Sequence, residues 1–224
     1  MFTVDFRFEE NQTTIEFPCN EEFLSAKFDE LGVKDKLKTS QYMVGTNYAA
    51  LKWLVTDFAD VDELNFLAKC LDSFDKYELN NLWFERIQDI TATENLYAAN
   101  NVLRAVERAE KNNELDKLEA VIDFADRYDS ASIIKLEDNI DNFRYFDNVY
   151  DKEGLGRALI DENDDYSIHE DIEEFFMFEQ YAESVMDECD CKFCDNGAVL
   201  LEGLTLAEIL GEDNQSEEMA MGGM

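Results

Sequence analysis

Apolar and polar residues alternate near the start of the chain. In two short segments, one before and one after residues 9–12, every second residue is apolar or β-branched. These residues are Phe2, Val4, Phe6, Phe8, Thr13, Ile15 and Phe17. A period of two places alternate side chains on one face of a strand, so the pattern predicts a β-hairpin with its turn at residues 9–12.

A short helix and further strands are expected after this hairpin. Asn20 is suited to cap the start of a helix, and Gly32 is suited to end it. The apolar face of that helix is expected to consist of Phe23, Leu24, Phe28 and Leu31. Residues 42–44 and 51–55 are candidates for strands that join the same sheet. Together these elements predict a small domain of β-sheet and helix over residues 1–60.

The middle of the chain has the spacing of amphipathic helices. Leucine, valine, isoleucine and alanine recur every three or four residues, which corresponds to one face of an α-helix. The helices that this period predicts cover residues 62–71, 75–88, 93–111, 114–128 and 130–142. Such a series predicts a helical bundle domain over residues 61–142. The bundle could equally be a structural spacer.

The last part of the chain mixes strand and helix patterns. The expected elements are a strand at 145–150, a helix at 152–160, another helix within 168–189 and a short strand at 198–201. They predict an acidic α+β domain over residues 143–210, followed by a flexible polar tail at 211–224. The fold class predicted for the whole chain is therefore α+β, with three domains in series.

Acidic residues outnumber basic ones almost three to one. The 224 residues include 53 Asp and Glu and 19 Lys and Arg, which gives a formal net charge of −34 and a pI near 4.1. Hydrophobic residues make up 46% of the chain, so the acidity is not that of a disordered tail. Because nucleic-acid binding needs Lys and Arg to neutralise phosphates, the charge excludes autonomous binding to DNA or RNA. It also opposes binding to anionic membranes.

Targeting signals and disulfide patterns are not evident in the sequence. No apolar run approaches the ~20 residues of a membrane-spanning helix, and no basic region followed by an apolar block lies near Met1. The chain has five cysteines, an odd number that does not favour a disulfide framework. We therefore expect a protein of the reducing cytoplasm.

The acidity is concentrated near the C-terminus. Residues 158–224 contain 20 acidic residues and one basic residue, and the stretch 161–190 alone contains 13 carboxylates and no Lys or Arg. Apolar residues are interleaved with these acids, so the stretch is expected to fold. As one continuous helix, its 30 residues would span roughly 45 Å, over which one DNA strand carries about 13 phosphates.

This coincidence predicts a set of carboxylates that imitates phosphates, and the alternative is a merely solvated acidic face. Glu179, Glu183 and Asp187 are spaced by four residues, so on one helix they would align on one face with no basic partner inside the stretch. The predicted phosphate-mimicking residues are Asp161, Glu162, Asp164, Asp165, Glu170, Asp171, Glu173, Glu174, Glu179, Glu183, Asp187 and Glu188.

Three cysteines overlap the end of this stretch. Cys189, Cys191 and Cys194 lie within six residues, and thiolates bind Zn²⁺ tetrahedrally. The side chains available as a fourth ligand are Cys19, Cys70, His169 and the carboxylates. Because no second Cys-x-x-Cys pair is present, the motif is half of a zinc site. The alternative is a reduced, partly buried cysteine cluster beside a turn at residues 195–197.

The sequence contains none of the common catalytic motifs. One histidine and no Gly-x-Ser-x-Gly, Walker or His-Glu-x-x-His pattern leave little basis for nucleophilic or metal-dependent chemistry. A pair of carboxylates at catalytic distance is expected by chance in so acidic a chain. We therefore expect a non-catalytic protein with no cofactor.

Aromatic residues crowd the predicted acidic helix. Successive helical residues point about 100° apart, so Phe175, Phe176 and Phe178 cannot all face one small core. We expect Phe175 and Ile172 to lie in the core. The residues expected to contact a second copy in a homodimer are Phe178, Tyr181 and Val185. The alternative is that elements of the same chain cover both faces.

Two segments near the C-terminus carry a family resemblance. They are Tyr-Asp-Lys-Glu-Gly-Leu-Gly-Arg-Ala-Leu-Ile-Asp-Glu at 150–162 and Ile-Glu-Glu-Phe-Phe-Met-Phe-Glu-Gln-Tyr-Ala at 172–182. Both resemble the C-terminal region of ArdA-type antirestriction proteins, and residues 62–68 and 75–79 resemble a stretch of that family's central domain. The chain departs from the family at residues 182–183, where Ala-Glu stands in place of the usual Gly-Arg.

The resemblance implies an elongated three-domain protein that dimerises and imitates bent duplex DNA. Proteins of this type occupy the DNA-binding groove of type I restriction–modification enzymes, are encoded on mobile elements and act in the bacterial cytoplasm. The implied partner is such an enzyme, without nucleic acid or membrane. Three alternatives remain open: a mimic that inhibits another nuclease such as a CRISPR effector, an acidic chaperone or binding partner of a basic protein, and a zinc-binding regulator.

Overall fold

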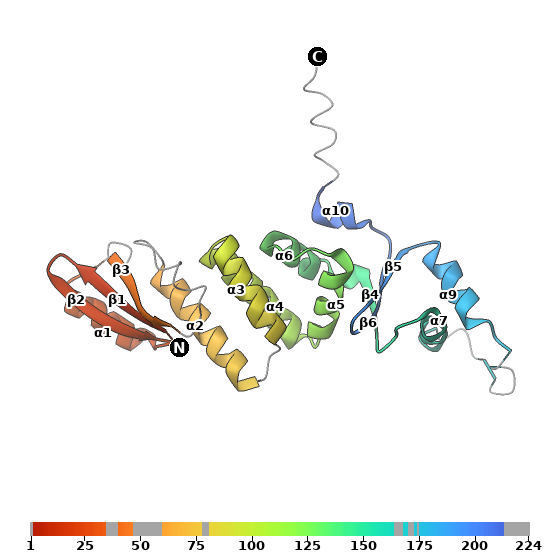
Figure 1. Cartoon of the computed structure of the whole chain (residues 1–224), viewed down its shortest axis with the longest axis horizontal. Helices are drawn as coiled ribbons and strands as arrows, with labels where there is room; N and C mark the ends of the chain where they lie inside the picture. The colour runs from red at the N-terminus through yellow and green to blue at the C-terminus, as the bar shows by residue number, and fades with distance from the viewer. Residues whose placement is uncertain are drawn as a thin grey trace, which may run out of the picture. The chain divides into compact units, whose positions relative to one another are not determined.

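The described residues form two three-stranded antiparallel sheets that helices join in sequence (Figure 1). The structure is a computed structural model that describes residues 2–34, 40–46, 60–77, 81–163, 168–169, 173 and 175–212. It divides into two compact units, residues 1–107 and residues 108–224, which we call the N-terminal unit and the C-terminal unit. The mixed α+β class predicted from the sequence is confirmed.

The hairpin predicted by the two-residue period is present in the N-terminal unit. β1 (Phe2–Phe8) pairs with β2 (Asn11–Phe17) on one side and with β3 (Ser40–Thr46) on the other. The inward face of the hairpin is fully buried and consists of Val4, Phe6, Ile15 and Phe17. β3 confirms the strand expected at 42–44, whereas the strand expected at 51–55 lies outside the described residues.

Helix α1 (Glu21–Leu31) follows the hairpin as expected. The Asn20 side chain accepts a hydrogen bond from the backbone N–H of Phe23 at 2.7 Å, and Gly32 ends the helix with a φ of 76°. Leu24, Phe28 and Leu31 form the buried face, and the Phe28 ring lies 5.2 Å from that of Phe6. The expected core position of Phe23 is wrong, because this residue precedes Leu24 by one helical step and its side chain is exposed.

The middle of the chain is helical, with boundaries that differ from the prediction. α2 (Val61–Tyr77), α3 (Asn81–Thr93) and α4 (Leu96–Lys111) follow one another. The break predicted at residues 72–74 is wrong, because no Gly or Pro interrupts the helix there and α2 continues through it. The buried residues of α2 and α3 include Leu64, Leu67, Trp83 and Ile87.

The C-terminal unit contains the second sheet. Its elements are α5 (Leu115–Ala125), α6 (Ser130–Asp138), the 3-10 turn η3 (Ile140–Asn142), β4 (Phe143–Asp147), α7 (Lys152–Asp161), α9 (Phe178–Met186), β5 (Asp190–Cys194), β6 (Gly197–Leu201) and α10 (Leu206–Leu210). The sequence pattern predicts β6, but it misses α10 and also β5, whose residues were interpreted only as a cysteine cluster. The strand expected at 145–150 begins and ends earlier, as β4.

Helices cover both faces of this sheet. β6 lies between β4 and β5 and is buried along its whole length. Its residues Ala198 and Leu200 pack with Leu155 of α7 and Ala182 of α9, whereas α5 contacts all three strands on the opposite face (Figure 1). The fold therefore places α7 and α9 together as the outer layer on one side of the C-terminal sheet.

The boundary between the two units lies inside α4, between Glu107 and Arg108. It falls within the range 61–142 that the sequence predicts as one helical domain. The division into domains at 1–60, 61–142 and 143–210 stays a prediction, and most of the predicted tail, from residue 213 onward, lies outside the described residues. Within the described part of the chain, no helix combines the length and apolarity needed to cross a membrane.

Candidate acidic interaction surface

Close packing of two helices forms the base of the candidate surface. The Asp151 side chain caps the start of α7 by accepting a hydrogen bond from the Gly154 N–H at 2.8 Å. Gly156 of α7 faces the first residue of α9, and a Cβ added there would lie 2.1 Å from the backbone oxygen of Phe178. Only glycine permits this approach, so Gly156 allows α9 to pack closely against α7.

The exposed carboxylates of this layer, which we call the acidic surface, come from both helices and the residues around them. They are Glu153, Asp161, Glu162, Glu173, Glu179, Glu183, Asp187 and Glu188. All but Glu153 belong to the predicted phosphate-mimicking set. The remaining predicted members, Asp164, Asp165, Glu170, Asp171 and Glu174, lie outside the described residues.

The carboxylates do not lie on one long helix. α7 ends at Asp161 and α9 begins at Phe178 after a bend at residues 175–177, so the span of about 45 Å for one continuous helix does not apply. The helices expected at 152–160 and within 168–189 are confirmed as α7 and α9. Glu179 and Glu183 lie one turn apart on α9, and Asp187 follows as its C-terminal cap. The acids are therefore grouped on two short helices rather than aligned along one axis.

Basic residues from outside the stretch 161–190 pair with several of these acids. Lys152 lies 2.7 Å from Glu183, and Arg144 bonds to Glu162 at 2.7 Å and to Glu202 at 2.8 Å. The hydrogen bond to Glu183 raises the pKa of Lys152. The sequence prediction missed these pairs because it considered bases only within the acidic stretch.

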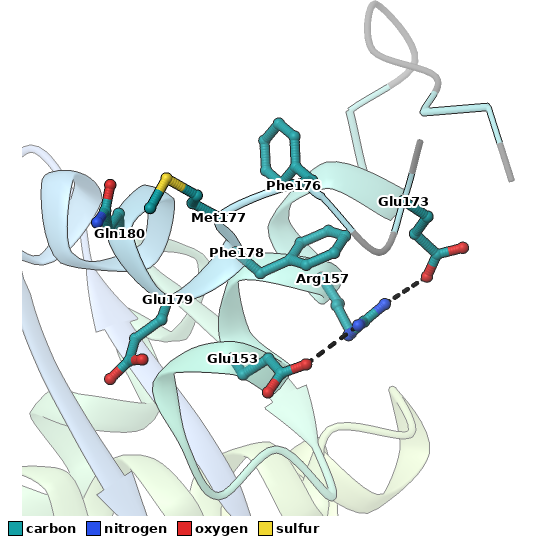
Figure 2. Close-up of a pocket in the computed structure, with 8 residues that line it drawn as sticks. All are labelled: Glu153, Arg157, Glu173, Phe176, Met177, Phe178, Glu179 and Gln180. Carbon is teal, nitrogen blue, oxygen red and sulfur yellow. Dashed lines mark hydrogen bonds and ion pairs between the residues drawn. The ribbon is translucent and has the colours of Figure 1, made fainter. Parts of the chain in front are cut away.

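Arg157 makes three contacts at this surface (Figure 2). Its guanidinium bonds to Glu153, four residues earlier on α7, at 3.0 Å and also to Glu173. The same guanidinium lies 4.1 Å from the ring centroid of Phe178. The i, i+4 spacing of Glu153 and Arg157 was a sequence signal for the first contact, whereas nothing local indicated the other two.

Most basic side chains of the C-terminal unit contact oxygen atoms of the unit itself. Its sequence contains 33 acidic and 9 basic residues. Among the contacts that the described residues make, seven of the basic side chains donate to a carboxylate or a backbone carbonyl: Arg108, Arg127, Lys135, Arg144, Lys152, Arg157 and Lys192. The unit therefore presents a surplus of carboxylates to the solvent, while its few cations hold internal contacts.

The aromatic residues have the reverse of the expected arrangement. Phe178 is 6% exposed and packs against α7, whereas Phe175 is 74% exposed, so the expected core position of Phe175 is wrong. The expected exposure of Phe178 as a subunit contact is also wrong, because α9 starts at this residue and turns its side chain toward Arg157. Tyr181 and Val185 are partly buried beside the core of the C-terminal unit. The homodimer itself stays a prediction.

An open cavity lies beside these aromatic residues. It has a volume of about 300 Å³, and its lining comes from α7, from the bend before α9 and from the first turn of α9. Figure 2 shows the Phe178 ring between Phe176 and the Arg157 guanidinium. Phe176 and Met177, at the bend, remain exposed.

The three clustered cysteines do not converge. Cys189 and Cys191 pack beside the apolar residues between the sheet and α7, whereas the Cys194 Sγ donates to the backbone oxygen of Ala120 in α5 at 3.5 Å. Burial raises the pKa of the Cys191 thiol to about 11, so it stays protonated near neutrality. In the described part of the chain, no group of three or more His, Cys, Asp or Glu residues is placed to hold a metal ion.

Comparisons with known proteins leave the family unassigned. No protein-family model and no curated protein matches the chain. The likeness to ArdA-type proteins therefore depends only on the residues at 62–68, 75–79, 150–162 and 172–182.

Proposed function

We propose that the chain is a non-catalytic DNA mimic whose carboxylates occupy the DNA-binding groove of a type I restriction–modification enzyme and so inhibit it. The proposal combines the charge of the C-terminal unit with the resemblance of residues 150–162 and 172–182 to ArdA-type antirestriction proteins. In this proposal the protein acts as a homodimer in the cytoplasm of a bacterial host.

The surplus of carboxylates on a packed layer is the observation that carries the proposal. A DNA-binding protein gains much of its affinity from contacts with the DNA phosphates, and a groove that attracts phosphates also attracts carboxylates. On α9, Glu179 and Glu183 are separated by about 6 Å along the axis, close to two phosphate steps of a DNA strand at about 3.4 Å each. Such an array needs no chemistry, only rigid presentation.

Rigid presentation is what the packing of α7 and α9 supplies. Carboxylates on a disordered tail would lose conformational entropy when they bind, which weakens the complex. Here Leu155, Leu159 and Ala182 are buried beneath the acids, and the close contact at Gly156 limits movement between the helices. This support favours a mimic over an acidic chaperone that works through a disordered acidic tail.

A cleavage assay tests the proposal directly. The purified protein, in molar excess, should protect unmodified DNA from a type I restriction enzyme, and the protection should weaken as salt rises because screening reduces the attraction between charges. The protein should not shift DNA in a gel. A shift of DNA, or undiminished cleavage by every type I enzyme tested, would contradict the proposal.

Two matched sets of substitutions locate the effect. In the C-terminal set, six exposed acids become amides: Asp161, Glu179, Asp187, Glu188, Asp190 and Asp195. In the N-terminal set, six exposed acids of the other unit become amides: Glu9, Glu10, Glu16, Asp29, Glu85 and Asp89. Both sets change the net charge equally.

The C-terminal set should weaken inhibition by at least about tenfold. Six exposed charges that each contribute about 0.3 kcal/mol together exceed the 1.4 kcal/mol of a tenfold change. The N-terminal set should weaken inhibition much less. Equal losses would mean that net charge alone matters, as expected of an acidic partner of basic proteins in general. Retention of another nuclease rather than restriction subunits in a pull-down would favour the alternative target.

A further inference from the structure

We propose that the cavity between α7 and the first turn of α9 receives an arginine side chain of the partner protein. The inference rests on the proposed function only in that the partner has a basic, DNA-binding face. It identifies one point on the acidic surface where the shape of the cavity and its apolar side chains would contribute to binding of the partner, in addition to charge. Such a point would act as an anchor within an otherwise diffuse electrostatic contact.

The charge of the cavity lining favours a cation even though one is already present. The described lining contains three carboxylates, Glu153, Glu173 and Glu179, and one guanidinium, Arg157, so the lining itself carries a net charge of −2. Arg157 bonds to the first two carboxylates. Within the described part of the chain, the Glu179 carboxylate makes no ion pair or hydrogen bond with another side chain and is exposed at the start of α9.

The apolar part of the lining favours arginine over lysine. Phe176 is 39% exposed and Met177 is 61% exposed, so both present apolar surface beside the carboxylates of the lining. They offer a surface to the methylene stem of a long side chain whose charged head reaches the acids. A planar guanidinium also stacks on aromatic rings and forms paired hydrogen bonds with carboxylates, neither of which an ammonium does as well.

The same chemistry already occurs inside the site. Arg157 holds its guanidinium 4.1 Å from the Phe178 ring centroid and between two carboxylates. The Phe176 ring packs 4.8 Å from that of Phe178, so the exposed ring continues an aromatic group that binds a guanidinium on its other side (Figure 2). The exposed Phe176 ring and the Glu179 carboxylate thus offer a second guanidinium the same two kinds of partner, an aromatic ring and a carboxylate, that Arg157 already has.

Methyl NMR of the full chain tests this proposal. Protein labelled at the methionine methyl groups gives seven signals, one per methionine, and Met177→Leu assigns the signal in the cavity. The probes are acetyl-Gly-Arg-Gly-amide and acetyl-Gly-Lys-Gly-amide at constant ionic strength. The Arg peptide should shift the Met177 signal in a saturable way and bind at least about threefold more tightly than the Lys peptide, as stacking on an aromatic ring predicts.

Three variants separate the site from general attraction. Phe176→Ala removes an aromatic wall of the cavity and Glu179→Gln removes one of its negative charges, so each should reduce binding of the Arg peptide by about threefold or more. Glu188→Gln makes the same charge change as Glu179→Gln on an exposed residue outside the lining and should leave binding almost unchanged. Unaltered signals of the other methionines would show that each variant is folded.

Several outcomes would overturn the proposal. Equal binding of both peptides, or an equal loss in Glu179→Gln and Glu188→Gln, would mean diffuse attraction. A Met177 signal that shifts with protein concentration without peptide would mean that a second copy covers the patch.

The failure of this inference is distinguishable from the failure of the proposed function. Inhibition of a type I enzyme that Phe176→Ala leaves intact would overturn the anchor alone. Selective peptide binding without any inhibition would instead overturn the proposed function and leave the cavity as an arginine site.

Discussion

The two units of the chain have similar kinds of core and very different surfaces. Each contains a three-stranded antiparallel sheet with a fully buried apolar face or strand. Yet the N-terminal unit has 20 acidic and 10 basic residues, whereas the C-terminal unit has 33 acidic and 9 basic ones. A core of this kind therefore forms without strong acidity. Because excess charge of one sign repels itself, the surplus of acids in the C-terminal unit opposes its folding, and the proposed function would account for that surplus.

The two units also differ in how their sheets are covered. In the C-terminal unit, α5 packs on one face and α7 with α9 on the other, so the acids of α7 and α9 lie outside a closed core. In the N-terminal unit, the polar side chains of Gln12 and Thr14 bond to Asp5 on the face of the hairpin opposite its buried residues. The comparison indicates that surface charge in the C-terminal unit can be changed without opening its core.

The largest effect is expected from Phe178, which links α9 to α7. Phe178→Ala should destabilise the C-terminal unit by about 3–5 kcal/mol, because it empties a buried aromatic position. Phe175→Ala, three residues earlier at an exposed site, should change stability by no more than about 0.5 kcal/mol. Urea unfolding followed by far-ultraviolet circular dichroism measures both changes.

Tryptophan fluorescence provides the internal control for that experiment. Both tryptophans, Trp53 and Trp83, belong to the N-terminal unit, so their emission reports on this unit alone. The fluorescence transition should therefore stay in place in both variants. If it moves together with the dichroism signal in Phe178→Ala, the two units unfold as one and the comparison between them fails.

The hairpin and the capped helix were predictable because their signals are local. Alternation over residues 2–17 and the Asn20 and Gly32 caps determine those elements without help from distant residues. The position of Phe178 was not predictable, because the start of α9 depends on its contact with Gly156, 22 residues earlier. The ion pairs of the acidic surface were missed for the same reason, since Lys152 and Arg144 lie outside the acidic stretch.

The second-largest effect on stability is expected from the close contact at Gly156. Gly156→Ala should destabilise the C-terminal unit by about 1–3 kcal/mol, because the new Cβ would meet the backbone oxygen of Phe178 at 2.1 Å and α9 would have to move. Gly154→Ala is the matched control on the same helix, where the nearest atom to the new Cβ is a side-chain oxygen of Asp151 at 3.3 Å. Gly154→Ala should cost less stability than Gly156→Ala, and this loss is offset by a gain of about 0.5–1 kcal/mol in stability because alanine replaces glycine in a helix. Equal losses in the two variants, by the same dichroism measurement, would contradict the close-packing argument.

The next prediction concerns how the stability of the N-terminal unit depends on pH. Burial, and then the nearby Glu107 carboxylate, raise the pKa of the Cys70 thiol from 9.0 to about 12. The folded state therefore holds this proton more tightly than the unfolded state, so the thiol's contribution to stability is complete below pH 9.0 and is lost as pH rises toward 12. Between pH 8 and pH 10.5 the advantage of the wild type over Cys70→Ala should shrink by at most about 2 kcal/mol. Fluorescence-detected urea unfolding in a reducing buffer measures it, and a difference independent of pH would mean that the thiol is not shielded.

The smallest effect is expected from single ion pairs, and it too differs between the units. In the N-terminal unit, Arg104 bonds to both oxygens of Glu63, at 2.9 and 3.1 Å, and lies 4.4 Å from the Phe66 ring centroid. A double-mutant cycle with Arg104→Met and Glu63→Gln should give a coupling of up to about 1 kcal/mol, since the pair is partly buried and held by a ring. The Lys152–Glu183 pair of the acidic surface makes one contact with an exposed ammonium, and the cycle with Lys152→Met and Glu183→Gln should give no measurable coupling. A strong coupling at Lys152 would mean that the ion pairs, and not the apolar layer beneath them, hold α9 to α7. The acids of that surface would then serve the fold, and the contrast with the N-terminal unit would lose its functional meaning.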